Sequence, residues 1–266
     1  MILGGIVTPE LEHLIVAVGL AAARTVPLAW LVPAFGGPHV PSHIRVGLGL
    51  GLALLCLPSL RGVPLPGAGP AMWMLLVSRE VAVGATLGFV ASLLFRAAET
   101  AGQINDTLRG ANLAEVLSPV SEGRTSPLGD VSLLLTVVIF LELGGLGHVA
   151  TALARSYQAV PIGAAAGPAQ FGRVAGLTLA ASAQMLEAAL GLAAPAVVAL
   201  LLADLAMGAI GQAAPQIPLY FVAMPLKALI GVGAMLIALG ALDSAMTAGF
   251  GSWAVLLDRA VRAWRP

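Results

Sequence analysis

The chain has 266 residues, and its 13 basic and 13 acidic side chains give a formal charge of zero. Only 10% of the residues are charged, 59% are hydrophobic and the mean hydropathy is +0.96, whereas about 25% of residues are charged in an ordinary soluble domain. This composition excludes a soluble fold, a disordered chain and a nucleic-acid binder that relies on basic charge, and the single cysteine, Cys56, excludes a disulfide scaffold.

Six apolar segments follow one another along the chain, and each approaches the roughly 20 residues needed to cross a bilayer. They are expected near residues 11–34, 44–60, 71–95, 128–154, 174–209 and 219–248. Gly and Pro residues separate them, and runs of this length lack the period-two alternation of strands. The sequence therefore predicts an all-α, polytopic helical membrane protein with six main hydrophobic segments and helices broken by Pro and Gly.

The longest polar stretch, from Arg96 to Asp130, connects the third and fourth segments. Gly110, Pro119 and Gly123 prevent its second half from forming one continuous helix. Its composition is typical of a solvated loop, but long loops in compact helical proteins are often functional. Both interpretations stay open on composition alone.

Charged residues interrupt the apolar segments, although a charge at bilayer depth is costly and normally faces protein or a water-filled cavity. They are Arg24, Arg79, Glu80, Glu142, Glu187, Asp204, Lys227 and Asp243. We therefore expect the helices to pack mostly against other protein, which indicates an oligomeric assembly. Glycines four residues apart favour close helix packing as well; such pairs are Gly84 and Gly88, Gly47 and Gly51, and Gly172 and Gly176.

Two of these charges are predicted to form an ion pair. Asp204 lies near the end of the fifth segment and Lys227 near the start of the sixth, on either side of a turn with Pro215 and Pro218. In an antiparallel hairpin they would lie about 7 Å and about 12 Å from its tip, an offset that a lysine stem can span. The alternatives are that each charge faces water or pairs with a neighbouring subunit.

Residues from Ser252 to Arg265 have the pattern of a short basic amphipathic helix. Trp253 and Trp264 share its apolar face, so the segment suits a membrane interface, with both indole rings as anchors, or a partner groove. A frayed chain end is the alternative.

The sequence carries no recognisable motif for catalysis or nucleotide binding. It has no GxxxxGK[ST] loop, no HExxH and no paired CxxC. His39 and His43 are four residues apart, but Pro38 and Pro41 do not favour the helical geometry that a metal site would need there. We therefore expect no enzymatic activity, no catalytic residues, no metal and no cofactor.

A series of short motifs runs through most of the chain, from about Arg24 to Lys227. In chain order the motifs are Arg24 with Pro27, Glu80 with Gly84 and Gly88, Arg109-Gly110-Ala111, Ser126-Pro127-Leu128-Gly129, Ser156-Tyr157 with Pro161, Asp204-Leu205-Ala206-Met207-Gly208, Ala214-Pro215-Gln216 and Met224-Pro225-Leu226-Lys227. Their order and spacing resemble the integral-membrane export-gate subunit of type III secretion systems, called SctT in injectisomes and FliR in flagella. Asn105-Asp106 and residues 126–129 favour the injectisome branch. Gln212 stands where the family often has arginine, and no asparagine follows Gln216.

The resemblance implies a place in a helical export-gate ring. In that ring this subunit joins SctR/FliP-like and small SctS/FliQ-like subunits, and a SctU/FlhB-like switch subunit wraps around them. The ring would be the portal for exported unfolded proteins at the bacterial inner membrane, within the basal body, with membrane lipids and without nucleic acid as partners. Residues 1–173 would form a FliP-like part, 174–248 a FliQ-like helical hairpin and 249–266 a basic amphipathic tail.

In this family the central loop is a plug within the pore. The resemblance thus assigns a pore plug to the loop at about 96–130, with Arg109, Gly110, Asn112, Glu115, Pro119 and Gly123 as its site residues. It assigns the hairpin and its ion pair to Asp204, Pro215, Gln216, Pro225 and Lys227, and helix packing to Gly84 and Gly88.

Two other functions would also suit a helical membrane protein. A secondary transporter or permease for a small solute would explain interior charges, but it predicts inverted repeats, and the loop at 96–130 has no counterpart elsewhere in the chain. A membrane scaffold without a pore is the third possibility.

Overall fold

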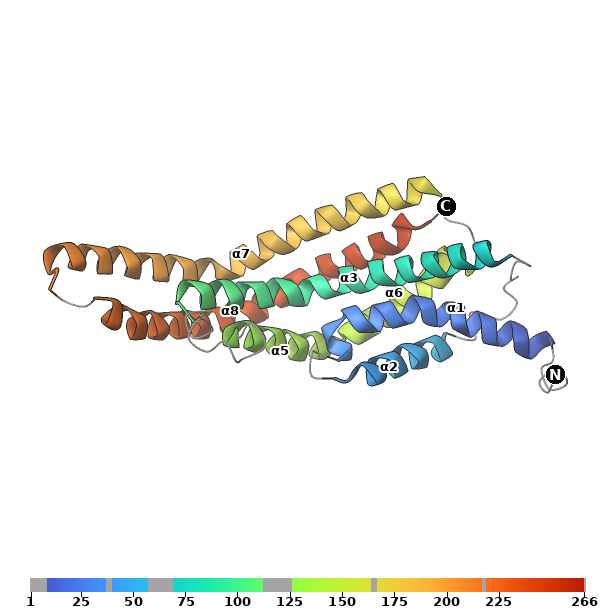
Figure 1. Ribbon diagram of the computed structural model, residues 1–266, viewed down its shortest axis with the longest axis horizontal. Helices are drawn as coiled ribbons and strands as arrows, with labels where there is room; N and C mark the ends of the chain where they lie inside the picture. The colour runs from blue at the N-terminus through green and yellow to red at the C-terminus, as the bar shows by residue number, and fades with distance from the viewer. Residues whose placement is uncertain are drawn as a thin grey trace. The chain divides into compact units, whose positions relative to one another are not determined.

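The structure is a computed structural model that describes residues 9–36, 40–56, 69–111, 126–163, 167–216 and 219–265. These residues form helices and no strand, which confirms the all-α prediction. The elements, shown in Figure 1, are α1 (Pro9–Leu31), the 3-10 turn η1 (Pro33–Phe35), α2 (Ser42–Leu55), α3 (Pro70–Leu108), α5 (Pro127–Glu142), α6 (Gly145–Ala159), α7 (Pro168–Ala213) and α8 (Leu219–Ala263).

Each predicted apolar segment coincides with a helix, but the described residues do not supply six membrane spans. Four helices are long and apolar enough to cross a membrane, namely α1, α3, α7 and α8. The second segment forms only the 14-residue α2, which is about 21 Å long and therefore shorter than a hydrocarbon core of about 30 Å. The fourth segment is split into α5 and α6 at Gly144, whose φ is 72°, and counts as a fifth span only if the bent pair is taken together.

Prolines mark the starts of several helices and also lie within others. The helices α3, α5 and α7 all begin at a proline, a residue that suits the first helical position because its missing N–H would have no acceptor there. Pro27, Pro195 and Pro225 lie inside α1, α7 and α8, where each removes one backbone hydrogen bond without ending the helix.

The chain divides into two compact units, each assembled from segments that are distant in sequence. Unit 1 comprises Met1–Leu93, Phe140–Ser182 and Gly251–Pro266, and unit 2 comprises Leu94–Ile139 and Ala183–Phe250. The helices α3, α5, α7 and α8 therefore each contribute residues to both units.

The core of unit 1 is built from α1, the first part of α3, α6 and the last turns of α8. Leu28, Leu87, Leu153 and Leu257 are among its fully buried side chains. Within the same unit α1 and α2 lie side by side (Figure 1), and Gly49 of α2 makes their close approach possible.

The C-terminal residues differ from the predicted membrane-interface anchor. They continue α8 to Ala263, and Trp253 and Trp264 are only 5% and 1% exposed. Trp253 meets the ring of Phe140 edge-on at 5.5 Å, and Trp264 meets Phe171 at 5.3 Å. The prediction of headgroup anchors is wrong, and so is the alternative of a frayed end, because the apolar face finds aromatic partners within unit 1.

The helices α7 and α8 leave much of their apolar surface open. The apolar span Pro168–Ala213 of α7 is 22% buried and the span Phe221–Ala238 of α8 is 17% buried, whereas the span Pro70–Leu108 of α3 is 67% buried. Leu202, Leu205, Phe221 and Leu229 are each more than 60% exposed. Exposed apolar surface of this extent marks an interface with protein or membrane.

Candidate functional site at the base of the polar loop and in the hairpin

The polar loop is shorter than the expected 96–130, because α3 continues to Leu108 and the chain leaves the helix at Gly110. Gly110 has a φ of 81°, a conformation that costs glycine little and other residues much. The Gly110 N–H donates to the carbonyl oxygen of Thr107 at 3.2 Å, and the Ala111 N–H donates to that of Asp106 at 3.0 Å. These two bonds form a Schellman motif, which satisfies the last carbonyls of the helix and turns the chain away from its axis.

The other end of the loop is the N-terminus of α5. Ser126 precedes Pro127, the first residue of α5, and its Oγ accepts a hydrogen bond from the Gly129 N–H at 3.2 Å. A serine cap followed by proline is a strong helix-start signal. Of the predicted plug residues, Asn112, Glu115, Pro119 and Gly123 lie outside the described residues, and Arg109 and Gly110 lie at the base of the loop.

The buried carboxylate of Asp106 joins the two ends of the loop. Its Oδ1 accepts from Arg109 Nε at 2.7 Å and from Nη2 at 2.6 Å. Its Oδ2 accepts from Ser126 Oγ at 2.6 Å and from the Leu128 N–H at 2.9 Å. Asp106 is fully buried, so these charge-assisted bonds replace water around the carboxylate. Local sequence patterns do not connect Asp106 with Ser126, although both belong to motifs of the resemblance.

Small residues allow α3 and α5 to approach closely beside this carboxylate. A Cβ atom on Gly102 would lie 2.5 Å from the carbonyl oxygen of Leu128, and one on Gly129 would lie 3.0 Å from Gln103 Cγ and 3.3 Å from the carbonyl oxygen of Glu99 on α3. The first distance is one that real Cβ atoms essentially never show, and the other two are tight contacts. Gly102 and Gly129 therefore fix the spacing at which Asp106 reaches the N-terminus of α5.

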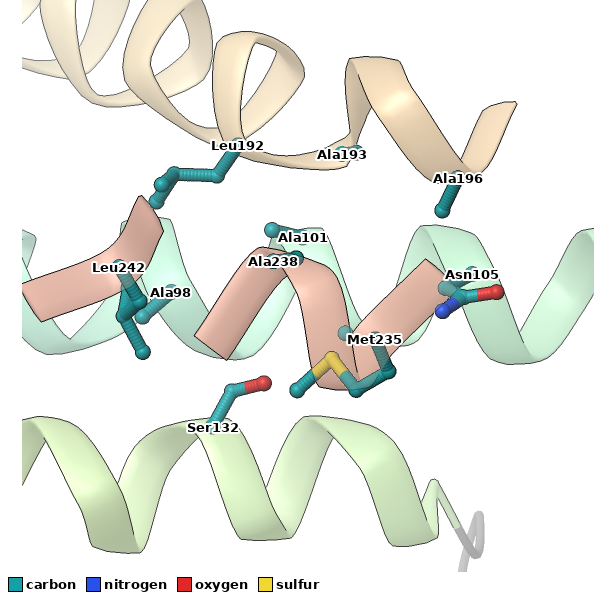
Figure 2. A pocket seen from close by; sticks show the side chains of 11 residues that line it. Ala98, Ala101, Asn105, Ser132, Leu192, Ala193, Ala196, Met235, Ala238 and Leu242 are labelled. Carbon is teal, nitrogen blue, oxygen red and sulfur yellow. The ribbon is translucent and has the colours of Figure 1, made fainter. Parts of the chain in front are cut away.

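Asn105 attaches the same turn of α3 to α8. Its Nδ2 donates to the carbonyl oxygen of Gly231 at 3.0 Å, and a Cβ atom on Gly231 would lie 3.0 Å from Arg109 Cδ. Figure 2 shows Asn105 at one end of a small cavity of about 20 Å³ to which α3, α5, α7 and α8 contribute. Most of its lining is alanine or other small or apolar residues, so it is a packing gap among these four helices.

The structure brings together the two charges predicted to pair in the hairpin. Lys227 Nζ contacts Asp204 Oδ1, and α7 and α8 run in opposite directions on either side of the turn between them (Figure 1). Pro215 and Gln216 lie in that turn, and Pro225 lies inside α8 two residues before Lys227. Pro218 lies outside the described residues.

A second charged cluster lies in unit 1 and is fully buried. Arg24 Nε donates to Glu80 Oε2 at 2.7 Å, Nη1 donates to Ser156 Oγ at 3.1 Å and Nη2 donates to the Val160 carbonyl oxygen at 2.9 Å. The guanidinium also lies 4.4 Å from the centre of the Tyr157 ring. The cluster thus joins α1, α3 and the end of α6, which residue types and spacing in the sequence did not predict.

Among the predicted glycine pairs, Gly84 and Gly88 contact α1. A Cβ atom on Gly84 would overlap the carbonyl oxygen of Arg24, and one on Gly88 would lie 2.9 Å from Leu28 Cα. Gly49 meets the Val26 backbone in the same way, with a Cβ distance of 2.8 Å to Val26 Cα.

The other two predicted glycine pairs make no such contact. At Gly47, Gly51, Gly172 and Gly176 an added Cβ would meet nothing within 4 Å in the part of the chain that the structure describes. The spacing of these pairs arises in a chain with 32 glycines without marking a helix contact within the chain.

These arrangements hold helices and the ends of the polar loop in place. Among the described residues, no group of three or more His, Cys, Asp or Glu side chains is placed to hold a metal ion. The charged side chains at the loop base and in unit 1 are engaged by other groups of the same chain. The arrangement can therefore position a loop and present apolar helix faces to neighbours.

Comparison with known proteins gives a consistent match. The family described as bacterial export proteins, family 1, matches residues 15–252. The Yop proteins translocation protein T of Yersinia pestis is 33% identical over 70% of this chain and 71% of its own length. The secretion system apparatus protein SsaT of Salmonella typhimurium is 28% identical over 86% and 88%, respectively. The flagellar biosynthetic protein FliR of Escherichia coli is 28% identical over 80% of each chain.

Proposed function

Because the chain belongs to the bacterial export proteins of family 1, we propose that it is a core component of a type III secretion export apparatus. The match over residues 15–252 carries this proposal, since it includes all of unit 2, most of unit 1 and every motif of the resemblance. Relatives named for translocation, secretion and flagellar biosynthesis support export of proteins over transport of a small solute.

The proposed partners are the sibling subunits of an export-gate ring at the bacterial inner membrane. SctR/FliP-like and SctS/FliQ-like subunits would pack beside this chain, a SctU/FlhB-like subunit would wrap the ring, and unfolded proteins would pass through it. The open apolar faces of α7 and α8 support this assembly, because 22% and 17% burial leaves them without enough protein neighbours in one chain. Residues 174–248 would be the FliQ-like hairpin, 1–173 the FliP-like part and 249–266 the C-terminal end.

Co-expression with the siblings tests the assembly. Leu229 is 73% exposed on α8, so Leu229→Glu should prevent incorporation into a purified ring by placing a charge in an apolar interface. Leu229→Met keeps the apolar character at the same position and should assemble normally. A chain that remained a monodisperse monomer in the presence of the siblings would contradict the export-gate proposal.

The polar loop is proposed to act as the pore plug. Its two ends meet at a buried carboxylate on α3, an arrangement that supports a loop held in one place rather than a loose connection. Deleting part of residues 110–122 should raise the ion conductance of the assembled ring while the ring still forms. An unchanged conductance in a properly assembled ring would exclude the plug.

A further inference from the structure

Asp106 occupies an unusual electrostatic position between two helix ends. It lies in the last turns of α3, where the helix dipole disfavours an anion, and its Oδ2 accepts the Leu128 N–H at the start of α5, where the dipole favours one. Arg109 supplies the compensating charge at the α3 end. The position of the Asp106 carboxylate is therefore favourable only while Arg109 and the N-terminus of α5 both lie beside it.

Every group that contacts this carboxylate is able to donate a hydrogen bond. The donors are two N–H groups of Arg109, the Ser126 hydroxyl and the Leu128 N–H. An ionised carboxylate is an acceptor on both oxygens, whereas the amide of an asparagine presents donors on one side. An asparagine at position 106 has the same shape, but its single amide oxygen could accept from either Arg109 or the groups at the start of α5. Its NH2 group would then face the remaining donors.

From this geometry we propose that Asp106 is a positioning residue that fastens the two ends of the polar loop to each other. The proposal rests on the plug function proposed above and adds the group that joins the end of α3 to the start of α5. Asn105 connects this fastening to α8 through its bond to the Gly231 carbonyl oxygen at 3.0 Å. Asp106 holds the exit of the loop from α3 and its return into α5 at a fixed spacing.

The Leu128 amide reports on this fastening independently of pore conductance. Leu128 is the second residue of α5, so its N–H has no acceptor within the helix and depends on Asp106. In the assembled ring, Asp106→Asn should therefore speed deuterium uptake in a peptide covering residues 126–132. It should also raise ion conductance several-fold, toward the value of the loop deletion.

Asp130→Asn is the matched control, because Asp130 is an exposed carboxylate in the first turn of α5. It should change neither deuterium uptake nor conductance. If Asp106→Asn does not assemble, Ser126→Ala replaces it, since this variant removes one donor to Asp106 and leaves the Arg109 pair intact. Its expected changes have the same direction and smaller size.

The outcomes separate this proposal from the plug function. If the loop deletion raises conductance and the position 106 variant behaves like the control in both measurements, Asp106 is not the fastening and the plug function stands. If the deletion leaves conductance unchanged, the plug function fails, and faster deuterium uptake in Asp106→Asn still shows that Asp106 holds the loop ends. Unchanged uptake in both test variants would overturn the fastening.

Discussion

Two of the ion pairs that join helices in the described structure are built in opposite ways. In unit 1 Arg24 and Glu80 are both 0% exposed, and the guanidinium is further engaged by Ser156 and the Val160 carbonyl oxygen. In unit 2 the side chains of Lys227 and Asp204 are 22% and 44% exposed. The pair in unit 1 is enclosed by groups of the same unit, whereas the hairpin leaves its pair partly open to water or to a neighbour.

The apolar surfaces repeat this difference. The apolar span of α3 is 67% buried, and those of α7 and α8 are 22% and 17% buried. A chain in which α3 is largely covered while α7 and α8 stay open fits a subunit whose remaining apolar helix faces are covered on assembly. Charge composition alone does not distinguish α3 from α7 and α8, because all three helices contain charged residues among Leu, Ala and Gly.

The largest expected effect follows from removing one charge of the buried pair. Glu80→Gln leaves Arg24 buried without its counter-charge, and breaking a buried pair in this way costs about 3–5 kcal/mol. The midpoint of thermal denaturation of the detergent-solubilised complex should fall accordingly. Replacing both Arg24 and Glu80 by methionine should recover part of the loss, because Arg24 is then no longer a buried charge without its partner. Arg79, whose Nη1 lies 3.5 Å from Glu80 Oε1, loses that carboxylate but keeps its bond to the Pro161 carbonyl oxygen, so the recovery should be incomplete.

Glu187→Gln is the control for this substitution, because Glu187 is exposed on α7. It should leave the denaturation midpoint nearly unchanged. If Glu80→Gln were as stable as this control, the pair would contribute nothing beyond a surface charge, and the contrast between the two regions would disappear.

A smaller effect is expected from adding one methyl group at the contact of α1 with α3. In Gly84→Ala the new Cβ overlaps the Arg24 carbonyl oxygen, so the helices must separate at a cost of about 1–3 kcal/mol. Gly47→Ala meets nothing within 4 Å in the described structure and should stabilise helix α2 slightly, by up to about 1 kcal/mol. Denaturation midpoints that shift in the same direction for both variants would contradict the packing assigned to Gly84.

Local sequence patterns predicted the helices well because each apolar run and its flanking turn residues lie close together in the chain. The ion pair of Asp204 and Lys227 is also predictable from the sequence, since a hairpin turn fixes the offset of residues on either side of it. The length of α2 is not predictable in this way, because hydropathy measures composition and does not mark where a helix ends. For that reason six apolar segments do not give six spans in the described residues.

Contacts between distant segments could not be predicted in this way. Arg24 and Glu80 are 56 residues apart and Asp106 and Ser126 are 20 apart, and helical periodicity says nothing about which faces meet. Gly49 shows the same limit, because it contacts Val26 while Gly47 and Gly51, the pair with the expected spacing, do not meet another helix in the described structure. The sequence predicts a membrane interface or a partner groove for the tryptophans near the C-terminus, because their partners within the chain are more than 80 residues away and local patterns do not reveal them.

The smallest effect on the chain itself is expected at the hairpin pair. Asp204→Asn and Lys227→Met should each lower stability by about 0.2–1 kcal/mol, the range of exposed ion pairs. Their effect on ring assembly should be larger, because a neighbouring subunit that covers the hairpin would bury the remaining charge without a partner. The amount of ring recovered with the siblings measures this, and Asp243→Asn, at an exposed position of α8, is the control.

The double variant decides whether the two charges act on each other in the ring. If Asp204 and Lys227 pair directly, removing both should cost less ring than the sum of the single losses, because no lone charge remains at the interface. Exchanging the two residues should restore much of the assembly, since the geometry of the pair tolerates either direction of charge better than a lone charge. Strictly additive losses would rule out direct pairing within the ring. Each charge would then contact a separate group there, and the ion pair seen in the single chain would break on assembly instead of being covered by a neighbour.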